Sequence, residues 1–185
     1  MIGRRMVSRF KLDEGAIVAL SLLFHLCWLP APKAFGDDAA QIRSRLDALP
    51  ITAKVKLTDD EWRKILTPTQ FNILRQGGTE PPFTNAYADN QEQGTYLCAA
   101  CGSELFGSYA KFHSRSGWPS FYEPLSKQRI TLSTDTSSGM TRDEVKCARC
   151  GSHLGHVFND GPPPTHLRYC LNSVSLKFVK TTKNQ

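Results

Sequence analysis

Hydrophobic and polar residues follow three successive patterns along the 185-residue chain. Residues 16–29 form an apolar run that contains two polar residues, Ser21 and His25. Between residues 58 and 76 the apolar positions recur at the three- and four-residue spacing of an amphipathic helix. From residue 94 onward, short segments of strand-forming residues alternate with turn residues, and no helical period intervenes. The pattern predicts short N-terminal helices followed by a mainly β domain.

Two short helices are predicted within residues 58–76. Thr58 and Glu61 form a capping box, which satisfies backbone amides at a helix start, and this helix continues to Leu66. The second begins at Thr67-Pro68, because proline is favoured at the first helical position. It ends at Gly77-Gly78, since glycine readily takes the conformation that terminates a helix.

Short strands are predicted over most of the remaining chain. Strands without intervening helices favour an antiparallel sheet or a small barrel. In the last segment Tyr169 and Leu171 share one face, while Arg168 and Cys170 point to the other face together with Asn172. The apolar phase then slips, so a bulge is expected near residues 172–173. The predicted strands are 94–98, 104–106, 130–133, 144–147, 153–158 and 168–179.

The first 36 residues have the features of a secretory signal peptide. Arg4, Arg5, Arg9 and Lys11 precede the apolar run, prolines interrupt it, and Ala34-Phe35-Gly36 fits a small-residue cleavage site. The run is short for a membrane span, which needs about 20 residues. We therefore expect cleavage and an exported protein, periplasmic or secreted. An uncleaved membrane anchor and a buried helix of the domain are the alternatives.

The rest of the chain is divided by composition into three parts. Residues 37–54 are mixed and polar, and they predict a linker with one amphipathic turn around Ile42, Leu46 and Leu49. Residues 55–179 form the domain, and residues 180–185 form a tail.

The net charge gives little support to a nucleic-acid partner. The formal charge is +6, and residues 1–36 contribute five basic and two acidic side chains, so +3 remains for the rest. A nucleic-acid site needs a denser basic cluster than these scattered residues provide. The single apolar run also excludes a multi-span membrane protein, so membrane contact is expected only through an uncleaved leader.

Two Cys-x-x-Cys-Gly turns form a candidate metal site. Cys98 and Cys101 make one pair, and Cys147 and Cys150 make the other. Two such turns predict a tetrahedral four-cysteine zinc site that clamps two distant hairpins and has no open position for catalysis. The alternative is two redox motifs or two disulfides in an exported protein. The βαβ context of a thioredoxin-like motif is absent, which favours zinc.

Cys170 is the cysteine of the domain that lies outside these pairs. Arg168 and the histidines of His153-Leu154-Gly155-His156 are candidates to lie near it, because a cation or an imidazole lowers a thiol pKa and creates a nucleophile. In a regular strand His153 and His156 would face opposite sides, unless the chain bends at Gly155. The alternatives are an inert buried thiol and histidines that are ordinary hydrogen-bonded polar residues.

Several ordered motifs resemble those of the peptide-methionine (R)-S-oxide reductases, which return oxidised methionine to methionine. The resemblance covers residues 55–179 and includes both Cys-x-x-Cys pairs. It implies a small antiparallel β-sheet or barrel, a β-tent, clamped by zinc and preceded by short helices. The matching segments are Gly-Thr-Glu-Pro-Pro-Phe at 78–83, Ser-Gly-Trp-Pro-Ser-Phe at 116–121, His-Leu-Gly-His-Val-Phe at 153–158, Asp-Gly-Pro at 160–162 and Arg-Tyr-Cys-Leu-Asn-Ser at 168–173.

The resemblance also implies a role for each matching residue. A thiolate would attack the sulfur of methionine (R)-sulfoxide in an oxidised protein, histidines would bind and protonate its oxygen, and the thiol would become a sulfenic acid. An aromatic wall would bind the methyl group. The implied catalytic residues are Cys170, His153, His156, Asn172 and Arg168, the implied substrate-binding residues are Trp118 and Phe158, and one structural zinc ion would be bound by Cys98, Cys101, Cys147 and Cys150.

One position departs from the family pattern. Many members carry a resolving cysteine two residues before the tryptophan, where this chain has Ser116. An intramolecular disulfide with Cys170 cannot form there, so we expect a thioredoxin-like protein or another external thiol to reduce the sulfenic acid. Attack by a zinc-bound thiolate is the alternative. We expect a monomer whose partners are oxidised protein substrates and this reductant.

Two functions of other classes fit part of the sequence. The first is a zinc-stabilised binding module with an inert Cys170, although the basic residues are scattered and the aromatic residues form no stacking ladder. The second is a thiol oxidoreductase that uses the Cys-x-x-Cys pairs. One zinc ion per chain, with those cysteines protected from alkylation, would exclude the second.

Overall fold

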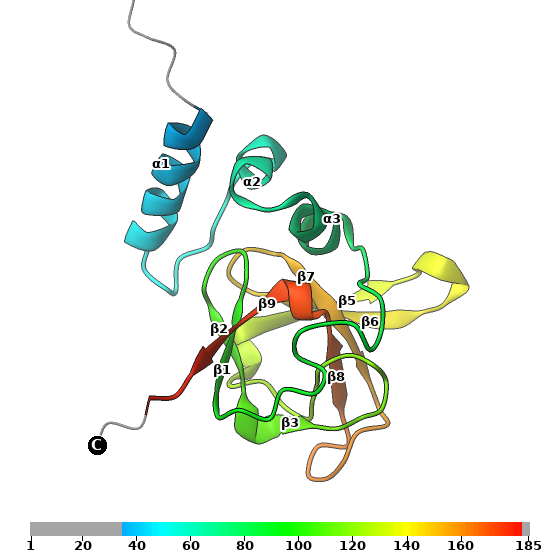
Figure 1. Ribbon diagram of the computed structural model, residues 1–185. Helices are drawn as coiled ribbons and strands as arrows, with labels where there is room; N and C mark the ends of the chain where they lie inside the picture. The colour runs from blue at the N-terminus through cyan, green and yellow to red at the C-terminus, as the bar shows by residue number, and fades with distance from the viewer. Residues whose placement is uncertain (1–34, 183–185) are drawn as a thin grey trace, which may run out of the picture. The chain divides into compact units, whose positions relative to one another are not determined.

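The computed structural model describes residues 35–182 (Figure 1). Three helices precede the strands: α1 spans Phe35–Ala48, α2 spans Asp59–Ile65 and α3 spans Pro68–Gln76. Residues 1–34 of the predicted signal peptide and residues 183–185 of the predicted tail lie outside the described residues. No helix within residues 35–182 combines the length and apolar content that crossing a membrane requires.

The strands form two antiparallel sheets, in agreement with the predicted mainly β fold. A three-stranded sheet has the order β2-β1-β9, and a six-stranded sheet has the order β3-β4-β8-β7-β6-β5. The bounds are β1 Gly94–Cys98, β2 Glu104–Gly107, β3 Lys111–Phe112, β4 Ser120–Phe121, β5 Ile130–Asp135, β6 Arg142–Cys147, β7 His153–Phe158, β8 Arg168–Leu171 and β9 Leu176–Lys180. Figure 1 shows the three helices following one another along one end of the β domain.

Helix α1 corrects the prediction of a linker with a single amphipathic turn over residues 37–54. It runs for 14 residues and begins at Phe35, within the predicted leader. Ile42 and Leu46 lie one helical turn apart, and both are buried in the main hydrophobic core. The apolar residues that predicted one turn therefore belong to a longer packed helix, because each turn buries its residue against the domain.

Arg149, within the second cysteine turn, binds the chain that follows α1. Its guanidinium donates to the carbonyl oxygens of Leu46 at 3.4 Å, Leu49 at 3.1 Å and Pro50 at 3.4 Å. It also donates to the carbonyl oxygen of Cys101 at 2.5 Å. One buried side chain thus connects the end of α1 with both cysteine turns.

The two short helices match their predicted start and stop signals. Both the Thr58–Glu61 capping box and a second one at Thr67 are formed. Gly77 terminates α3 in the left-handed conformation, with φ at 73°. Arg75, in the last turn of α3, donates to the carbonyl oxygen of Cys150 at 3.0 Å, which joins α3 to the second cysteine turn.

Aromatic side chains join the two sheets. Tyr96 of β1 packs edge-on against Phe121 of β4, with ring centroids 5.0 Å apart. Phe106 of β2 lies 4.8 Å from Phe121 and 5.6 Å from Tyr169 of β8. Such rings bury large apolar areas and add favourable ring–ring contacts. Tyr169 and Leu171 are both buried, so the core-facing side of β8 is the one that the alternation predicts.

The last predicted strand is wrong as a single bulged strand over residues 168–179. β8 ends at Leu171, a short 3-10 turn covers Ser173–Ser175, and β9 then pairs with β1 in the other sheet. The Glu80 carboxylate accepts the backbone amides of Ser173 and Val174. These amides have a side-chain partner in place of a neighbouring strand, so the chain can leave one sheet for the other.

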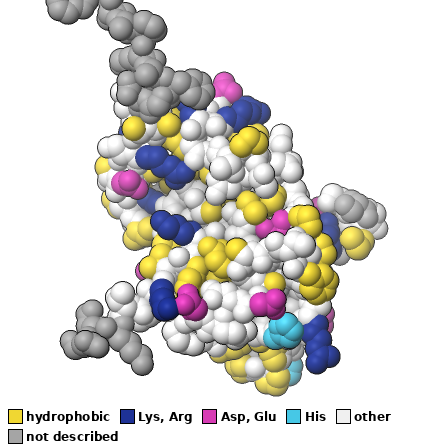
Figure 2. Space-filling model, viewed as in Figure 1, with side chains coloured by type: hydrophobic (Ala, Val, Ile, Leu, Met, Phe, Trp, Pro, Cys, Tyr) yellow, Lys and Arg dark blue, Asp and Glu magenta, His cyan; other side chains and the backbone are white. Residues whose placement is uncertain are grey.

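The visible surface carries mixed charge. On the face in Figure 2, Lys and Arg side chains lie apart from one another among acidic and apolar ones. A continuous basic stripe of the kind that binds nucleic acid is not present on that face. Large exposed apolar residues include Phe83, and Leu132 and Met140 on the β5–β6 hairpin.

Candidate active site and metal centre

The four cysteines of the two Cys-x-x-Cys-Gly turns lie together and are buried. Cys98 Sγ lies 3.7 Å from Cys150 Sγ, and Cys101 Sγ lies 3.7 Å from Cys147 Sγ. All four sulfur atoms lie within 4.8 Å of one another. A tetrahedral centre with metal–sulfur bonds of about 2.3 Å has sulfur–sulfur edges of about 3.8 Å. The arrangement therefore fits a structural metal ion bound by four thiolates.

The backbone of both turns supports this arrangement. Gly102 and Gly151 take left-handed conformations, with φ at 74° and 71°, and their amides donate to the carbonyl oxygens of Cys98 and Cys147 at 2.8 Å. A disulfide would require sulfur atoms about 2.05 Å apart. All cysteines among the described residues are free, so the disulfide alternative does not describe this structure. The first turn joins β1 to β2 and the second joins β6 to β7, so a metal ion here would connect the two sheets.

Cys170 lies in β8, between β4 and β7 of the six-stranded sheet. Strand pairing places it directly opposite Ser120 on one side and His156 on the other. Directly opposite residues of antiparallel strands project on the same face, with Cβ atoms about 4.5–5.5 Å apart. The register thus brings a hydroxyl and an imidazole next to the thiol. A pocket of about 110 Å³ is lined by Thr79, Trp118, Arg142, Gly155, His156, Phe158, Cys170, Leu171 and Asn172.

Three serine hydroxyls form a hydrogen-bonded chain beside Cys170. Ser116 Oγ lies 3.6 Å from Cys170 Sγ, and Ser114 Oγ lies 2.8 Å from Ser116 Oγ and 2.7 Å from Ser120 Oγ. Burial raises the pKa of the Cys170 thiol, while the Ser116 hydrogen bond, the charge of Arg168 and the Ser120 hydroxyl lower it in part. The hydroxyls and the guanidinium therefore favour the thiolate, in opposition to burial.

His156 lines the pocket, and Asp135 of β5 binds the side of its ring away from Cys170's strand. His156 Nε2 lies 2.8 Å from Asp135 Oδ2, which also accepts from Arg142 Nη2 at 2.8 Å. Hydrogen bonds from Ser137, together with His156 and Arg142, bring the pKa of Asp135 well below its usual range, so this side chain is a carboxylate. Because Nε2 is bound to Asp135, Nδ1 is the nitrogen available to a ligand.

His153 lies against His156 rather than in the pocket wall. Its side chain is 5% exposed, its ring centroid is 5.4 Å from that of His156, and its Nδ1 lies 2.8 Å from Glu144 Oε1. Its Nε2 is buried and has no hydrogen-bond partner among the described residues. Burial lowers the pKa of His153, although the Glu144 carboxylate acts in the other direction.

The two histidines share one side of β7 because the strand is bulged. His153 pairs with Lys146 and Gly155 pairs with Val145, so Leu154 is the extra residue between them. A Cβ atom on Gly155 would lie 2.1 Å from the carbonyl oxygen of Cys170. Only glycine lets β8 approach this closely. The two histidines share a side through the bulge at Leu154, and not through the bend that the sequence left open at Gly155.

Trp118 and Phe158 supply the aromatic part of the pocket wall. Trp118 Nε1 donates to the carbonyl oxygen of Glu80 at 3.1 Å, which orients the indole. The Arg168 guanidinium stacks on Phe158 with its Cζ 4.4 Å from the ring centroid, and it binds the Asp160 carboxylate through two hydrogen bonds of 2.8 and 2.9 Å. Arg168 therefore supports Phe158 from behind.

Asn172 connects the pocket to the segment around Glu80. It is 3% exposed, its Oδ1 accepts the Glu80 amide at 3.1 Å, and its Nδ2 donates to the carbonyl oxygen of Leu154 at 3.3 Å. Glu80 is itself 6% exposed. Both side chains satisfy backbone groups at the end of β8, so they determine where the pocket wall lies.

The structure brings most of the predicted site residues together. Cys170, His156, Trp118, Phe158 and Asn172 line one pocket. His153 and Arg168 are adjacent to it, packed against His156 and Phe158, and do not line it. Sequence reasoning assigned no role to Thr79, Glu80, Asp135, Arg142, Glu144 and Asp160. Glu80 and Asp160 fall in motifs already noted, whereas Asp135 and Arg142 depend on the pairing of β5 with β6, which no local pattern reveals.

Comparisons with known proteins place the chain in a family. Residues 66–180 match the SelR domain family. The chain is 58% identical over 127 residues to "Peptide methionine sulfoxide reductase MsrB" of Leptospira interrogans, which covers 69% of this chain and 97% of that protein. It is 59% identical over 124 residues to the protein of the same name from Methanosarcina barkeri, with 67% and 87% covered. With that of Thiobacillus denitrificans it is 60% identical over 121 residues, with 65% and 92% covered. The chain therefore belongs to the SelR-domain family of peptide methionine sulfoxide reductases, MsrB, and is an oxidoreductase.

Proposed function

We propose that this protein reduces the R epimer of methionine sulfoxide in oxidised proteins, with Cys170 as the nucleophile, and so repairs oxidative damage. The observation that carries the proposal is the strand register that sets Cys170 directly beside His156 in a pocket with an aromatic wall. A thiol, a proton donor and an apolar surface are the three elements that reduction of a methyl sulfoxide needs.

The reaction transfers one oxygen atom from substrate to enzyme. The Cys170 thiolate attacks the sulfoxide sulfur while the oxygen is protonated, which forms an S–S bond. The hydroxyl group then passes to the Cys170 sulfur as this S–S bond and the substrate's S–O bond break. Methionine sulfoxide is thereby reduced to methionine, and Cys170 is oxidised to a sulfenic acid that receives the oxygen. Proton donation of this kind contributes about 10²–10⁴-fold to a rate.

His156 is the proposed proton donor, because it lines the pocket opposite Cys170. The Asp135 carboxylate at Nε2 orients the ring, so Nδ1 is the atom that would meet the sulfoxide oxygen. His153 acts through His156 as a positioning residue, since their rings are in contact and Glu144 holds His153 in place.

Trp118 and Phe158 are the proposed binding surface for the substrate's methyl group. Burial of one methyl contributes roughly 1 kcal/mol. The methyl group would lie on the aromatic wall and the oxygen at His156. Only one of the two epimers can then also present its sulfur to Cys170. Selectivity for one epimer follows from these separate subsites.

Regeneration of Cys170 requires an external reductant. Ser116 occupies the position nearest the thiol where a resolving cysteine could act, and the other described cysteines are the four of the metal centre. One external thiol would displace water from the sulfenic acid to give a mixed disulfide, and a second would release Cys170 as a thiol. A thioredoxin-like protein supplies both thiols from one molecule.

Zinc is the proposed metal for the four-cysteine centre. Four thiolates at tetrahedral spacing are the donor set that zinc prefers in structural sites. Cys98, Cys101, Cys147 and Cys150 would hold the ion, whose contribution is to fix the two cysteine turns to one another. Metal analysis of the purified protein should give one zinc ion per chain.

Export and a monomeric state are part of the proposal. Export is inferred from the leader-like residues 1–36. N-terminal sequencing of the mature protein from its source, with light scattering of the same sample, tests both.

The central experiment measures reduction of the two dabsyl-methionine sulfoxide epimers separately, with dithiothreitol as the reductant. The full chain carrying its metal is compared with Cys170→Ser. Turnover of the R epimer alone, lost in Cys170→Ser while metal content and thermal unfolding stay unchanged, is the expected result. If a folded, metal-loaded protein turns over neither epimer, the enzyme proposal fails and a binding module takes its place.

A further inference from the structure

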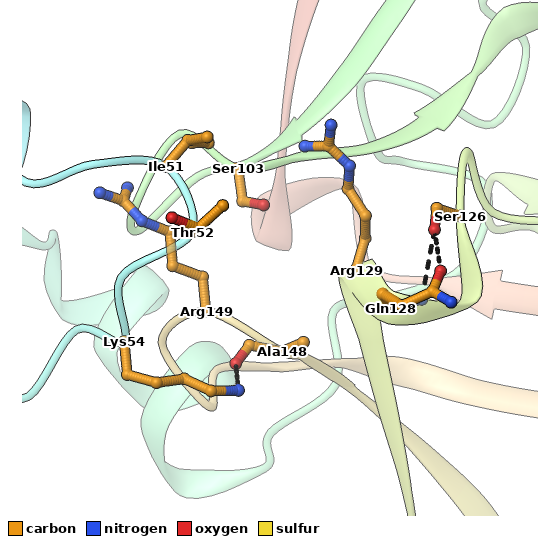
Figure 3. A pocket seen from close by; sticks show the side chains of 9 residues that line it. All are labelled: Ile51, Thr52, Lys54, Ser103, Ser126, Gln128, Arg129, Ala148 and Arg149. Carbon is orange, nitrogen blue, oxygen red and sulfur yellow. Dashed lines mark hydrogen bonds between the residues drawn. The ribbon is translucent and has the colours of Figure 1, made fainter.

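A second hollow, of about 340 Å³, lies at the other end of the β5–β6 hairpin from the catalytic pocket (Figure 3). Arg129 directly precedes β5 and Ala148 directly follows β6, whereas Asp135 and Arg142 form the far end, beside the catalytic pocket. At about 3.3 Å per strand residue, the length of β5 separates the two sites by roughly 17 Å. No residue lines both, so the hollow is independent of the site of Cys170.

The described lining of this hollow is basic. It includes Lys54, Arg129 and Arg149 and contains no acidic residue. Arg129 forms an ion pair with Glu104, which does not line the hollow. The Glu104 oxygen lies 3.5 Å from the Arg129 guanidinium, and the Glu104 side chain is 55% exposed. A pair this long and this solvated neutralises little charge. Three cationic side chains therefore line one concave surface, and the one carboxylate paired with them in the described part of the chain, that of Glu104, compensates their charge weakly.

A polar side chain also points into the hollow. Ser103 is 4% exposed and belongs to the lining of the hollow. Figure 3 shows its hydroxyl directed into the space between Arg149 and Arg129. The Arg149 guanidinium is directed to backbone carbonyl oxygens, among them those of Cys101 and Leu49, so Arg149 contributes charge to the hollow. A hydroxyl beside cationic side chains offers hydrogen bonds that an oxyanion can accept.

We propose that this hollow binds a small oxyanion of the phosphate type. Lys54 Nζ donates to the carbonyl oxygen of Ala148 at 2.5 Å, which leaves two of its hydrogens for a ligand. The Arg129 guanidinium and the Ser103 hydroxyl supply further donors, and Arg149, occupied with backbone carbonyl groups, supplies charge. The hollow, of about 340 Å³, is large enough for one phosphate group and some water. Both free phosphate and a phosphate group attached to a larger molecule are therefore candidate ligands.

Binding would join three segments that are distant in the sequence. Lys54 follows α1, Arg129 ends the turn before β5, and Arg149 lies within the second cysteine turn. An anion among them offsets the mutual repulsion of cations that folding brings together. A ligand that binds the folded state alone raises its stability in proportion to the logarithm of its concentration. Phosphate should therefore stabilise this protein more than salt of the same ionic strength does.

The test uses the full chain with its metal. Thermal unfolding is recorded in inorganic phosphate and in sodium chloride at matched ionic strength and pH, and binding is measured by titration calorimetry. We expect Tm to rise by roughly 5 °C at a phosphate concentration a hundred times the dissociation constant. O-phospho-L-serine forms the second arm: tighter binding than inorganic phosphate would identify the ligand as a phosphate group on a larger molecule, and weaker binding as the free ion.

Variants separate a specific site from general charge. Arg129→Gln and Ser103→Ala should each weaken phosphate binding, the first by about tenfold. Lys127→Gln is the matched control, because Lys127 belongs to the same turn, is exposed and does not line the hollow. Alkylation of Cys170 should leave the affinity unchanged. The proposal is overturned if phosphate neither binds nor raises Tm beyond chloride, or if Lys127→Gln loses as much affinity as Arg129→Gln.

Discussion

The Ser116 hydroxyl gives the sharpest test of the proposed nucleophile. It lies 3.6 Å from Cys170 Sγ and is supported by Ser114 at 2.8 Å. Ser116→Ala removes this donor and leaves the other groups that face the thiol: Ser120, the charge of Arg168, and His156 with Arg142 in the pocket wall. A hydroxyl hydrogen bond stabilises a thiolate much more than it stabilises a neutral thiol. Its loss should therefore raise the pKa of Cys170.

The size of this shift follows from the geometry. A hydrogen bond to an ionised group contributes about 1.5–3 kcal/mol. At 3.6 Å the contact to Cys170 is long even for sulfur, so the lower end applies. At about 1.4 kcal/mol per pKa unit, the pKa of Cys170 should rise by about one unit. Burial already raises this pKa, so near pH 7 the thiolate fraction falls about tenfold, and the deficit disappears once the pH exceeds the new pKa.

The assay follows alkylation of Cys170 by iodoacetamide as a function of pH, with the modified peptide quantified by mass spectrometry. The midpoint should move upward by about one unit in Ser116→Ala. Ser114→Ala is the matched control, because that hydroxyl contacts Ser116 and Ser120 and has no direct contact with the sulfur. An unchanged midpoint in Ser116→Ala, or an equal shift in Ser114→Ala, would refute the assignment of Ser116 as the thiolate's donor.

Three further changes test the surroundings of the site. Gly155→Ala should destabilise the fold by about 3 kcal/mol in urea unfolding, because its Cβ would lie 2.1 Å from the Cys170 carbonyl oxygen. Gly139→Ala is the control: its Cβ would meet nothing within 4 Å, so it should lose only about 1 kcal/mol, from its positive φ. Glu80→Gln should cost about 1–3 kcal/mol by the same measurement, since an amide can no longer accept both backbone N–H groups at the end of β8. The pKa of Asp135 in the folded protein is below its usual 3.8, so Asp135 stabilises the protein above that pH and loses this effect as the pH falls. In Asp135→Asn, the free energy of unfolding measured in urea should therefore fall less steeply between pH 5 and pH 3. A slope equal to that of the unchanged protein would contradict this.

Strand pairing does most to assemble this site. Cys170 occupies a central strand, and its two neighbours supply a hydroxyl and an imidazole at directly opposite positions. The catalytic candidates therefore depend on backbone hydrogen bonds more than on loops. A change that slips β8 against β7 by one residue would turn the thiol to the opposite face and separate it from His156.

Several features could be read from local sequence because their causes are local. The capping box of Thr58 and Glu61 involves residues three positions apart and is formed, and Pro68 starts α3 as predicted. The glycines that end the cysteine turns are needed wherever a left-handed residue closes such a turn, and Gly102 and Gly151 adopt that conformation. The alternation in β8 identified the buried face of Tyr169 and hence the side on which Cys170 lies.

The errors arose where the partner is distant in the chain. Residues 37–54 read as a linker because one apolar residue per turn is a weak signal, and the helix is stabilised by a core and by Arg149, about a hundred residues away. Residues 168–179 read as one strand because local pattern does not show that Glu80 will cap the amides of Ser173 and Val174. Neither contact can be predicted from the spacing of residues in the segment that it stabilises.

Residue types at short, regular spacing were enough to predict the mainly β class, the two cysteine turns and the motif containing Cys170. The tertiary structure alone decided that His156 lines the pocket while His153 lies against it, that Asp135 orients His156, and that Ser116 faces the thiol. The physical reason is that these relations depend on strand register and on one bulge at Leu154, and a shift of a single residue would reverse which side chains meet.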